Sequence, residues 1–163
     1  MKKHWLETIL KELHSEAYHW SRQCCSFDED RAKDVLQLVY LKILEGKAVY
    51  KEKSQVKTWL FSVIRFTAYE EIKKEGKNAS LDKLPEMAYE NDPPENESHE
   101  ALLQALPDRQ KEVLLMVFYH NMTLEQCAEV MQLHIGTVRT HYDRGKKKMK
   151  ELIVKKTLHE NNR

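Results

Sequence analysis

The chain has 163 residues, of which a third are charged and only four are glycine, and its formal net charge is +1. This length and composition favour an all-α protein with one domain or two small ones, and they argue against long sheets. There is no stretch of about 18 apolar residues, and charged residues interrupt the N-terminus too early for a signal peptide. We therefore expect a cytoplasmic protein without membrane insertion.

The small net charge hides three differently charged parts. Residues 1–75 have 14 basic and 12 acidic side chains, residues 76–108 have two and eight, and residues 109–163 have 11 and six. The mixed start, acidic middle and basic end favour separate tasks for these parts.

The first 75 residues predict three helices. Apolar residues recur at helical spacing over 5–25, 29–46 and 58–74. A polar cluster at 26–30 supplies acidic caps for the second helix, which should end near Gly46. Three amphipathic helices with short joins can close one small bundle.

Helical spacing also predicts which side chains face the core of this bundle. Trp5 and Trp20 are expected to point inward from the first helix. Trp59 is better explained as a core residue than as an exposed stacking surface, because it lies on the apolar face of the third helix. The inward residues expected on that helix are Trp59, Leu60, Val63, Ile64, Ala68 and Ile72.

The segment 76–100 is polar, acidic and interrupted by three prolines. It contains too little apolar surface to form a core of its own, and we therefore expect a flexible acidic linker. Helical spacing resumes at Ala101, and Asp108 is expected to cap a helix that turns Val113, Leu114, Val117 and Phe118 inward.

Residues 123–144 predict a helix-turn-helix. Asn121 suits the left-handed conformation at the end of the preceding helix, and Thr123 with Gln126 forms a capping-box pattern. After a turn at Gln132–His134, a second helix should present side chains that can reach base edges or phosphates of duplex DNA. These side chains are Thr137, Arg139, Thr140, Asp143, Arg144 and Lys147.

The sequence gives little support for a metal or catalytic site. His14, His19 and the adjacent Cys24 and Cys25 are possible ligands, but neighbouring cysteines on a helix point in different directions and the usual C-x₂-C spacing is missing. The chain also has no H-E-x-x-H motif and no glycine-rich phosphate loop. We expect no metal, no cofactor and no enzymatic activity.

Four short segments, in this order, resemble the extracytoplasmic-function class of bacterial sigma factors in the sigma-70 family. They are DVLQ at 34–37, TWLFSVIR at 58–65, LPDRQKEV at 106–113 and GTVRT at 136–140. The resemblance implies a region 2-like domain over 1–75, the linker over 76–100 and a region 4-like domain over 101–163. It also implies three kinds of partner: core RNA polymerase through its β′ and β subunits, promoter DNA, and an anti-sigma factor.

The resemblance further implies roles for individual residues. Asp34, Gln37 and Lys42 would contact the β′ subunit. The loop Tyr50, Lys51, Lys53 and Ser54, together with Arg65 and Tyr69, would bind the single-stranded minus-10 element, with Trp59 and Thr67 along the same strand. The six residues of the second helix of the helix-turn-helix would read the minus-35 duplex.

Four residues depart from the pattern of the family. Leu38 replaces a usual acidic residue, Phe66 a usual Asn, Gln132 a usual Gly in the turn, and His134 a usual Ser or Pro. A non-glycine residue at the left-handed turn position costs about 1 kcal/mol. The alternative reading is a stand-alone helix-turn-helix regulator, which would need a sensor or receiver domain that residues 1–75 do not predict.

Overall fold

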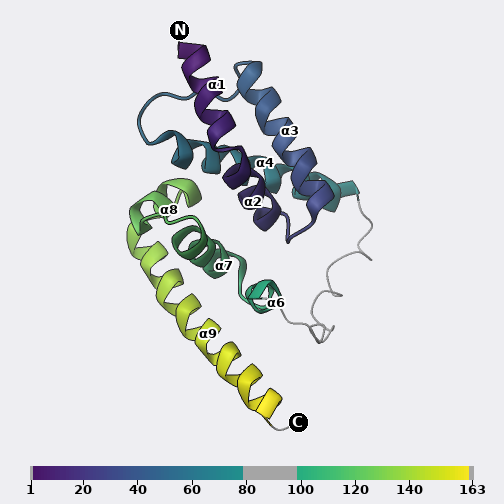
Figure 1. Ribbon diagram of the computed structural model, residues 1–163, viewed down its shortest axis with the longest axis vertical. Coiled ribbons are helices and arrows are strands. Elements are labelled where there is room, and N and C mark those ends of the chain that lie inside the picture. The colour runs from purple at the N-terminus through teal and green to yellow at the C-terminus, as the bar shows by residue number, and fades with distance from the viewer. Residues whose placement is uncertain (1, 79–98, 162–163) are drawn as a thin grey trace. The chain divides into compact units, whose positions relative to one another are not determined.

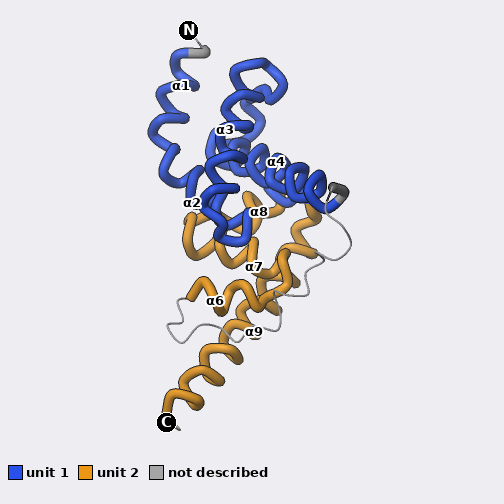
Figure 2. Tube along the Cα trace, turned by 90° about the vertical axis from the view of Figure 1, so that its right-hand side faces the viewer, with its two compact units in different colours: residues 1–79, 129–132 blue, residues 80–128, 133–163 orange. Residues whose placement is uncertain are grey.

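The computed structural model describes residues 2–78 and 99–161, and within these ranges it contains helices and no strand (Figure 1). The chain forms two compact units (Figure 2). The first contains residues 1–79 and 129–132, and the second contains residues 80–128 and 133–163. The prediction of an all-α protein with two small helical domains is confirmed.

The first predicted helix is divided in two. Helix α1 covers Lys2–Glu12 and α2 covers His14–Cys24, with Leu13 at φ −88° and ψ −1° between them. Trp20 is buried as predicted, whereas Trp5 is 47% exposed although its ring lies 6.3 Å from the Tyr50 ring. The inward orientation predicted for Trp5 was therefore wrong.

Helix α3, Glu29–Leu44, begins and ends where its sequence predicts. The Asp28 carboxylate accepts a hydrogen bond from the Arg31 backbone N–H at 3.1 Å, which caps the first turn. Gly46 follows the helix at φ +75°, a left-handed conformation in which glycine is unstrained.

Helix α4, Val56–Asn78, is longer than predicted at both ends and includes residues 76–78 of the expected linker. It packs on both α2 and α3. Contact with two neighbours widens its buried face, so Phe61 is fully buried although the predicted stripe omitted it. The Phe61 ring stacks on the Trp20 ring at 5.2 Å, and Trp20 Nε1 donates to the Phe61 carbonyl at 3.0 Å. Trp59, Val63 and Ile72 are only partly buried.

The second unit begins with α6, His99–Gln104, so the last two residues of the expected linker are also helical. The rest of that segment, 79–98, lies outside the described residues. Helix α7, Asp108–Leu114, has Pro107 at its N-cap position, so Asp108 is its first helical residue and not the predicted cap.

A π-helical turn, η2 (Leu115–Tyr119), continues α7 and alters the predicted inward face. It is closed by the His120 N–H bonding to the Leu115 carbonyl at 3.2 Å. A π turn contains more residues than an α turn and therefore rotates the following side chains about the axis. Val113 and Leu114 are buried as predicted, but Phe118 is 63% exposed, and the prediction that it faces the core was wrong.

Helices α8, Leu124–Met131, and α9, Ile135–Asn161, complete the chain. Helix α9 packs on α6 and α7. Gly145 allows close approach at this contact, because a Cβ at that position would lie 3.3 Å from the Leu114 side chain.

Candidate nucleic-acid interface

The start of the helix-turn-helix is fixed by reciprocal capping. The Gln126 backbone N–H donates to Thr123 Oγ1 at 3.1 Å, and the Thr123 N–H donates to Gln126 Oε1 at 2.9 Å. Asn121, two residues earlier, has φ +54°. The predicted capping box and left-handed Asn121 are both confirmed. These bonds satisfy backbone donors at the helix end and so define where α8 begins.

The turn between α8 and α9 tolerates both of its unusual residues. Gln132 has φ +54°, which is the strained position expected from the sequence. His134 Nδ1 accepts a hydrogen bond from the Gly136 backbone N–H at 3.3 Å. The imidazole thus performs the capping task of a serine at the start of α9. The turn forms without its usual glycine or serine.

Helix α9 separates a packed side from a polar side. Val138 and Gly145 are buried, and the predicted DNA-facing residues are all exposed. The exposed residues are Thr137, Arg139, Thr140, Asp143, Arg144 and Lys147. The Thr140 hydroxyl donates to the Gly136 carbonyl at 3.0 Å, which leaves its oxygen lone pairs as acceptors.

Positive charge continues along α9 beyond these residues. Lys146, Lys148 and Lys150 are exposed, and Lys146 Nζ lies 4.7 Å from the centroid of the Tyr142 ring. Partial burial, with smaller contributions from the positive charges of Arg109 and Arg144, lowers the pKa of His141. His141 is therefore neutral at pH 7, and the charge of this surface comes from arginine and lysine.

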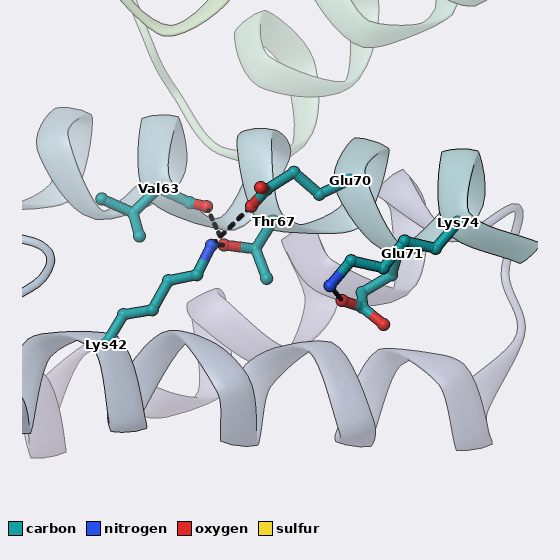
Figure 3. Close-up of polar contacts among 6 residues, drawn as sticks. All are labelled: Lys42, Val63, Thr67, Glu70, Glu71 and Lys74. Atoms are coloured by element: carbon teal, nitrogen blue, oxygen red, sulfur yellow. Dashed lines mark hydrogen bonds and ion pairs between the residues drawn. The ribbon is translucent and has the colours of Figure 1, made fainter.

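In the first unit, Asp34 and Gln37 are exposed on α3 one turn apart. Lys42 on the same helix forms hydrogen bonds to side chains of α4 (Figure 3). Its Nζ donates to Glu70 Oε1 at 2.7 Å and to Thr67 Oγ1 at 2.9 Å. The ammonium group of Lys42 is thus engaged inside the unit, unlike the polar groups of Asp34 and Gln37.

The same network accounts for Thr67. Its hydroxyl donates to the Val63 carbonyl at 2.8 Å and accepts from Lys42, and the residue is only 1% exposed (Figure 3). The expectation that Thr67 lines a DNA strand was wrong, because its side chain points into the contact between α3 and α4.

The loop between α3 and α4 is ordered by aromatic contacts. The Tyr50 hydroxyl donates to the Ser54 carbonyl at 2.5 Å, which closes the loop on itself. The Tyr50 ring lies 5.3 Å from the Trp59 ring and 6.3 Å from the Trp5 ring. Lys51 and Lys53 are exposed on this loop, whereas the Tyr50 ring forms part of its support.

Helix α4 carries a second group of cations and rings. The Arg65 guanidinium lies 4.5 Å from the centroid of the Tyr69 ring, a cation–π geometry that holds both side chains on the surface. Phe66, between them in sequence, is 60% exposed. Sequence reasoning noted Phe66 only as a departure from a family pattern. In the sequence, the position of this aromatic residue directly after Arg65 is the feature that could have marked it as a candidate for nucleic-acid binding.

Among residues 2–78 and 99–161 there is no cluster of three metal-binding side chains. Burial raises the pKa of the Cys25 thiol to about 11 and that of Cys127 to about 12, so both are poor nucleophiles at neutral pH. None of the described helices combines the length and apolar character needed to cross a membrane.

Comparison with known proteins agrees with this geometry. Residues 6–78 match the family model for sigma-70 region 2, and residues 98–149 match the model for sigma-70 region 4. The RNA polymerase sigma factor SigV of Bacillus subtilis is 26% identical over 135 residues, which are 80% of this chain and 81% of that protein. The ECF RNA polymerase sigma factor EcfG of Rhodopseudomonas palustris is 26% identical over 134 residues, 78% of this chain and 74% of that protein.

Two solved structures share the fold. The sigma factor RpoE of Bartonella quintana, solved in complex with the anti-sigma factor NepR, superposes with a TM-score of 0.75 at 20% identity, over 90% of this chain and 95% of that one. CnrH, solved in complex with the cytosolic domain of CnrY, gives a TM-score of 0.66 at 16% identity, over 93% of this chain and 88% of that one.

Proposed function

The chain belongs to the sigma-70 family as a sigma factor of the extracytoplasmic-function type, and from this membership we propose a division of labour between its two units. The second unit reads the minus-35 element as duplex DNA. The first unit docks on core RNA polymerase and holds the melted minus-10 strand. The polymerase supplies the chemistry, and this chain supplies promoter recognition.

The exposed polar side of α9 carries this proposal. Helix α9 packs on its own unit through the buried residues Val138 and Gly145, and the capped helix α8 precedes it. Its opposite, exposed side can therefore enter a major groove while these packing contacts are kept. Arg139 and Arg144 are exposed there and can each donate two hydrogen bonds to a guanine edge. The lysines that follow along α9 supply contacts to phosphates.

For the first unit, we assign core-polymerase binding to Asp34 and Gln37 on the β′ subunit, through their exposed positions on α3. Lys42 supports that surface indirectly by holding α3 on α4. Lys51, Lys53, Arg65 and Tyr69 remain exposed or half-exposed, and they bind the minus-10 strand. Tyr50 and Ser54 act mainly by fixing the loop, because the Tyr50 hydroxyl is bonded to the Ser54 carbonyl.

An anti-sigma factor is a further proposed partner. The two solved structures described above were determined as complexes, one with the anti-sigma factor NepR and one with the cytosolic domain of CnrY. An apolar groove of about 710 Å³ in the first unit, between α1, the end of α3 and residues 46–52, offers surface for such a partner. Leu44 and Val49, two of its lining residues, are more than half exposed.

The stand-alone regulator is not favoured, because residues 2–78 form the helices of a region 2-like unit and contain no sheet of a receiver domain. Transcript starts mapped after forced expression test the proposed function. We expect new starts that share two promoter elements, one near minus-35 and one near minus-10. New starts that share only one element, or none, would contradict it.

A further inference from the structure

Phe66 occupies an unusual position for a large apolar side chain. It lies in the middle of α4 and is 60% exposed, while Leu60, Phe61 and Ile64 on the same helix are fully buried. Removing this ring from water therefore contributes little to folding of the first unit. Its exposure leaves the ring accessible to a binding partner.

The surroundings of Phe66 indicate what such a partner is. Lys42 Nζ lies 5.4 Å from the centroid of the Phe66 ring, and the same ammonium group is fixed by Glu70 and Thr67. The stacked Arg65–Tyr69 pair adjoins Phe66 on α4, and Lys73 follows two turns later, also exposed. An open aromatic face among cations has the composition that binds single-stranded nucleic acid by base stacking and phosphate contact.

We propose that Phe66 is a specificity-determining residue on which one unpaired base of the melted promoter strand stacks. This inference rests on the proposed function, because it requires that α4 faces that strand. The ring provides a π-face and no hydrogen bond, so Phe66 favours bases that stack well and does not read a donor or acceptor pattern. Lys42 acts as a positioning residue, since its ion pair with Glu70 fixes the ammonium group beside the ring.

The competing explanation is that Phe66 only shields the Lys42–Glu70 ion pair from water. In that case any apolar side chain of similar size would serve. Phe66→Leu keeps the apolar bulk and removes the π-face, whereas Phe66→Trp keeps and enlarges the π-face. These two variants separate stacking from shielding without a change of charge.

The test uses the full chain bound to core polymerase and a forked promoter template with the mapped minus-10 element. Each base of the single strand is replaced in turn by an abasic site, and template affinity is measured for wild type, Phe66→Leu and Phe66→Trp. We expect one abasic position to weaken wild-type binding roughly 5- to 150-fold, the range of one base–aromatic stack. Phe66→Leu should bind the intact strand correspondingly less well and should be insensitive to that abasic site, whereas Phe66→Trp should stay sensitive.

Equal sensitivity of wild type and Phe66→Leu at every abasic position would overturn the assignment of Phe66, while leaving promoter binding by the complex intact. A wild-type chain that gives core polymerase no affinity for the template would instead overturn the proposed function, and this inference with it. Circular dichroism and binding to core polymerase verify that each variant is folded.

Discussion

Lys42 on α3 and Glu70 on α4 form an ion pair, with 2.7 Å between Nζ and Oε1. The pair joins the helix that carries Asp34 and Gln37 to the helix that carries Arg65, Phe66 and Tyr69. It is partly shielded, with side-chain exposures of 27% for Lys42 and 41% for Glu70. This ion pair therefore contributes to fixing the proposed polymerase surface on α3 relative to the proposed minus-10 surface on α4.

Lys42→Ala should lower the free energy of unfolding of the first unit by about 1 kcal/mol, a value between that of an exposed ion pair and that of a buried charged hydrogen bond. All three tryptophans, Trp5, Trp20 and Trp59, lie in this unit, so tryptophan fluorescence in urea reports on it alone. Lys47→Ala is the matched control, because the Lys47–Glu45 pair is far more exposed. Equal losses in the two variants would show that the Lys42 network contributes no more than a surface pair.

Thr123→Ala should destabilise the helix-turn-helix by about 1 kcal/mol, because the backbone N–H of Gln126 loses its acceptor. Amide hydrogen exchange should show faster exchange in the first turn of α8. Thr157→Ala is the control, since the Thr157 hydroxyl only bonds back to the Ile153 carbonyl on the exposed end of α9. Unchanged exchange at Gln126 after Thr123→Ala would refute the capping box.

Gln132→Gly should stabilise the helix-turn-helix by roughly 0.5–1 kcal/mol, because glycine removes the strain of a left-handed residue and loses part of that gain as chain entropy. The same change at Glu129, an exposed position within α8, should destabilise by a comparable amount. Thermal unfolding followed by circular dichroism measures both. Destabilisation by glycine at both positions would contradict the strain assigned to Gln132.

Arg139→Ala or Arg144→Ala should weaken binding to the minus-35 element by about 1–3 kcal/mol at a position where the guanidinium donates two hydrogen bonds to a guanine edge. A side chain that contacts phosphate instead gives the same loss on every promoter variant. Binding to a set of minus-35 variants distinguishes the two roles for each arginine. Lys155→Ala, exposed near the far end of α9, is the control. Wild-type affinity of both arginine variants for every sequence would remove α9 as the reading helix.

Local signals in the sequence predicted local structure well. The Thr123–Gln126 capping box, the Asp28 cap and the left-handed Asn121 each depend on residues within a few positions of one another. The exposure of the six α9 residues followed from helical spacing. These features can be predicted without knowing which helices pack against one another.

The errors arose where a distant neighbour or an irregular turn decides the outcome. Phe118 was placed inward because a regular helix was assumed, whereas the π turn rotates it outward. Thr67 was expected to contact DNA, because the residues near it in the sequence do not indicate that its hydroxyl accepts a hydrogen bond from Lys42, 25 residues earlier. Trp5 was placed in the core because helical spacing alone does not reveal how far the neighbouring elements cover α1, where Trp5 is 47% exposed.

Binding of the purified chain to core RNA polymerase, with and without Asp34→Ala and Gln37→Ala together, tests the central claim most directly. Both residues are exposed, so the double variant should keep its circular dichroism spectrum and lose no more than about 0.5 kcal/mol of stability per site. We predict that wild type binds core polymerase and that the double variant binds measurably less well. Equal affinity of the two folded proteins would remove Asp34 and Gln37 from the docking surface, and absence of binding by wild type would contradict the sigma-factor function itself.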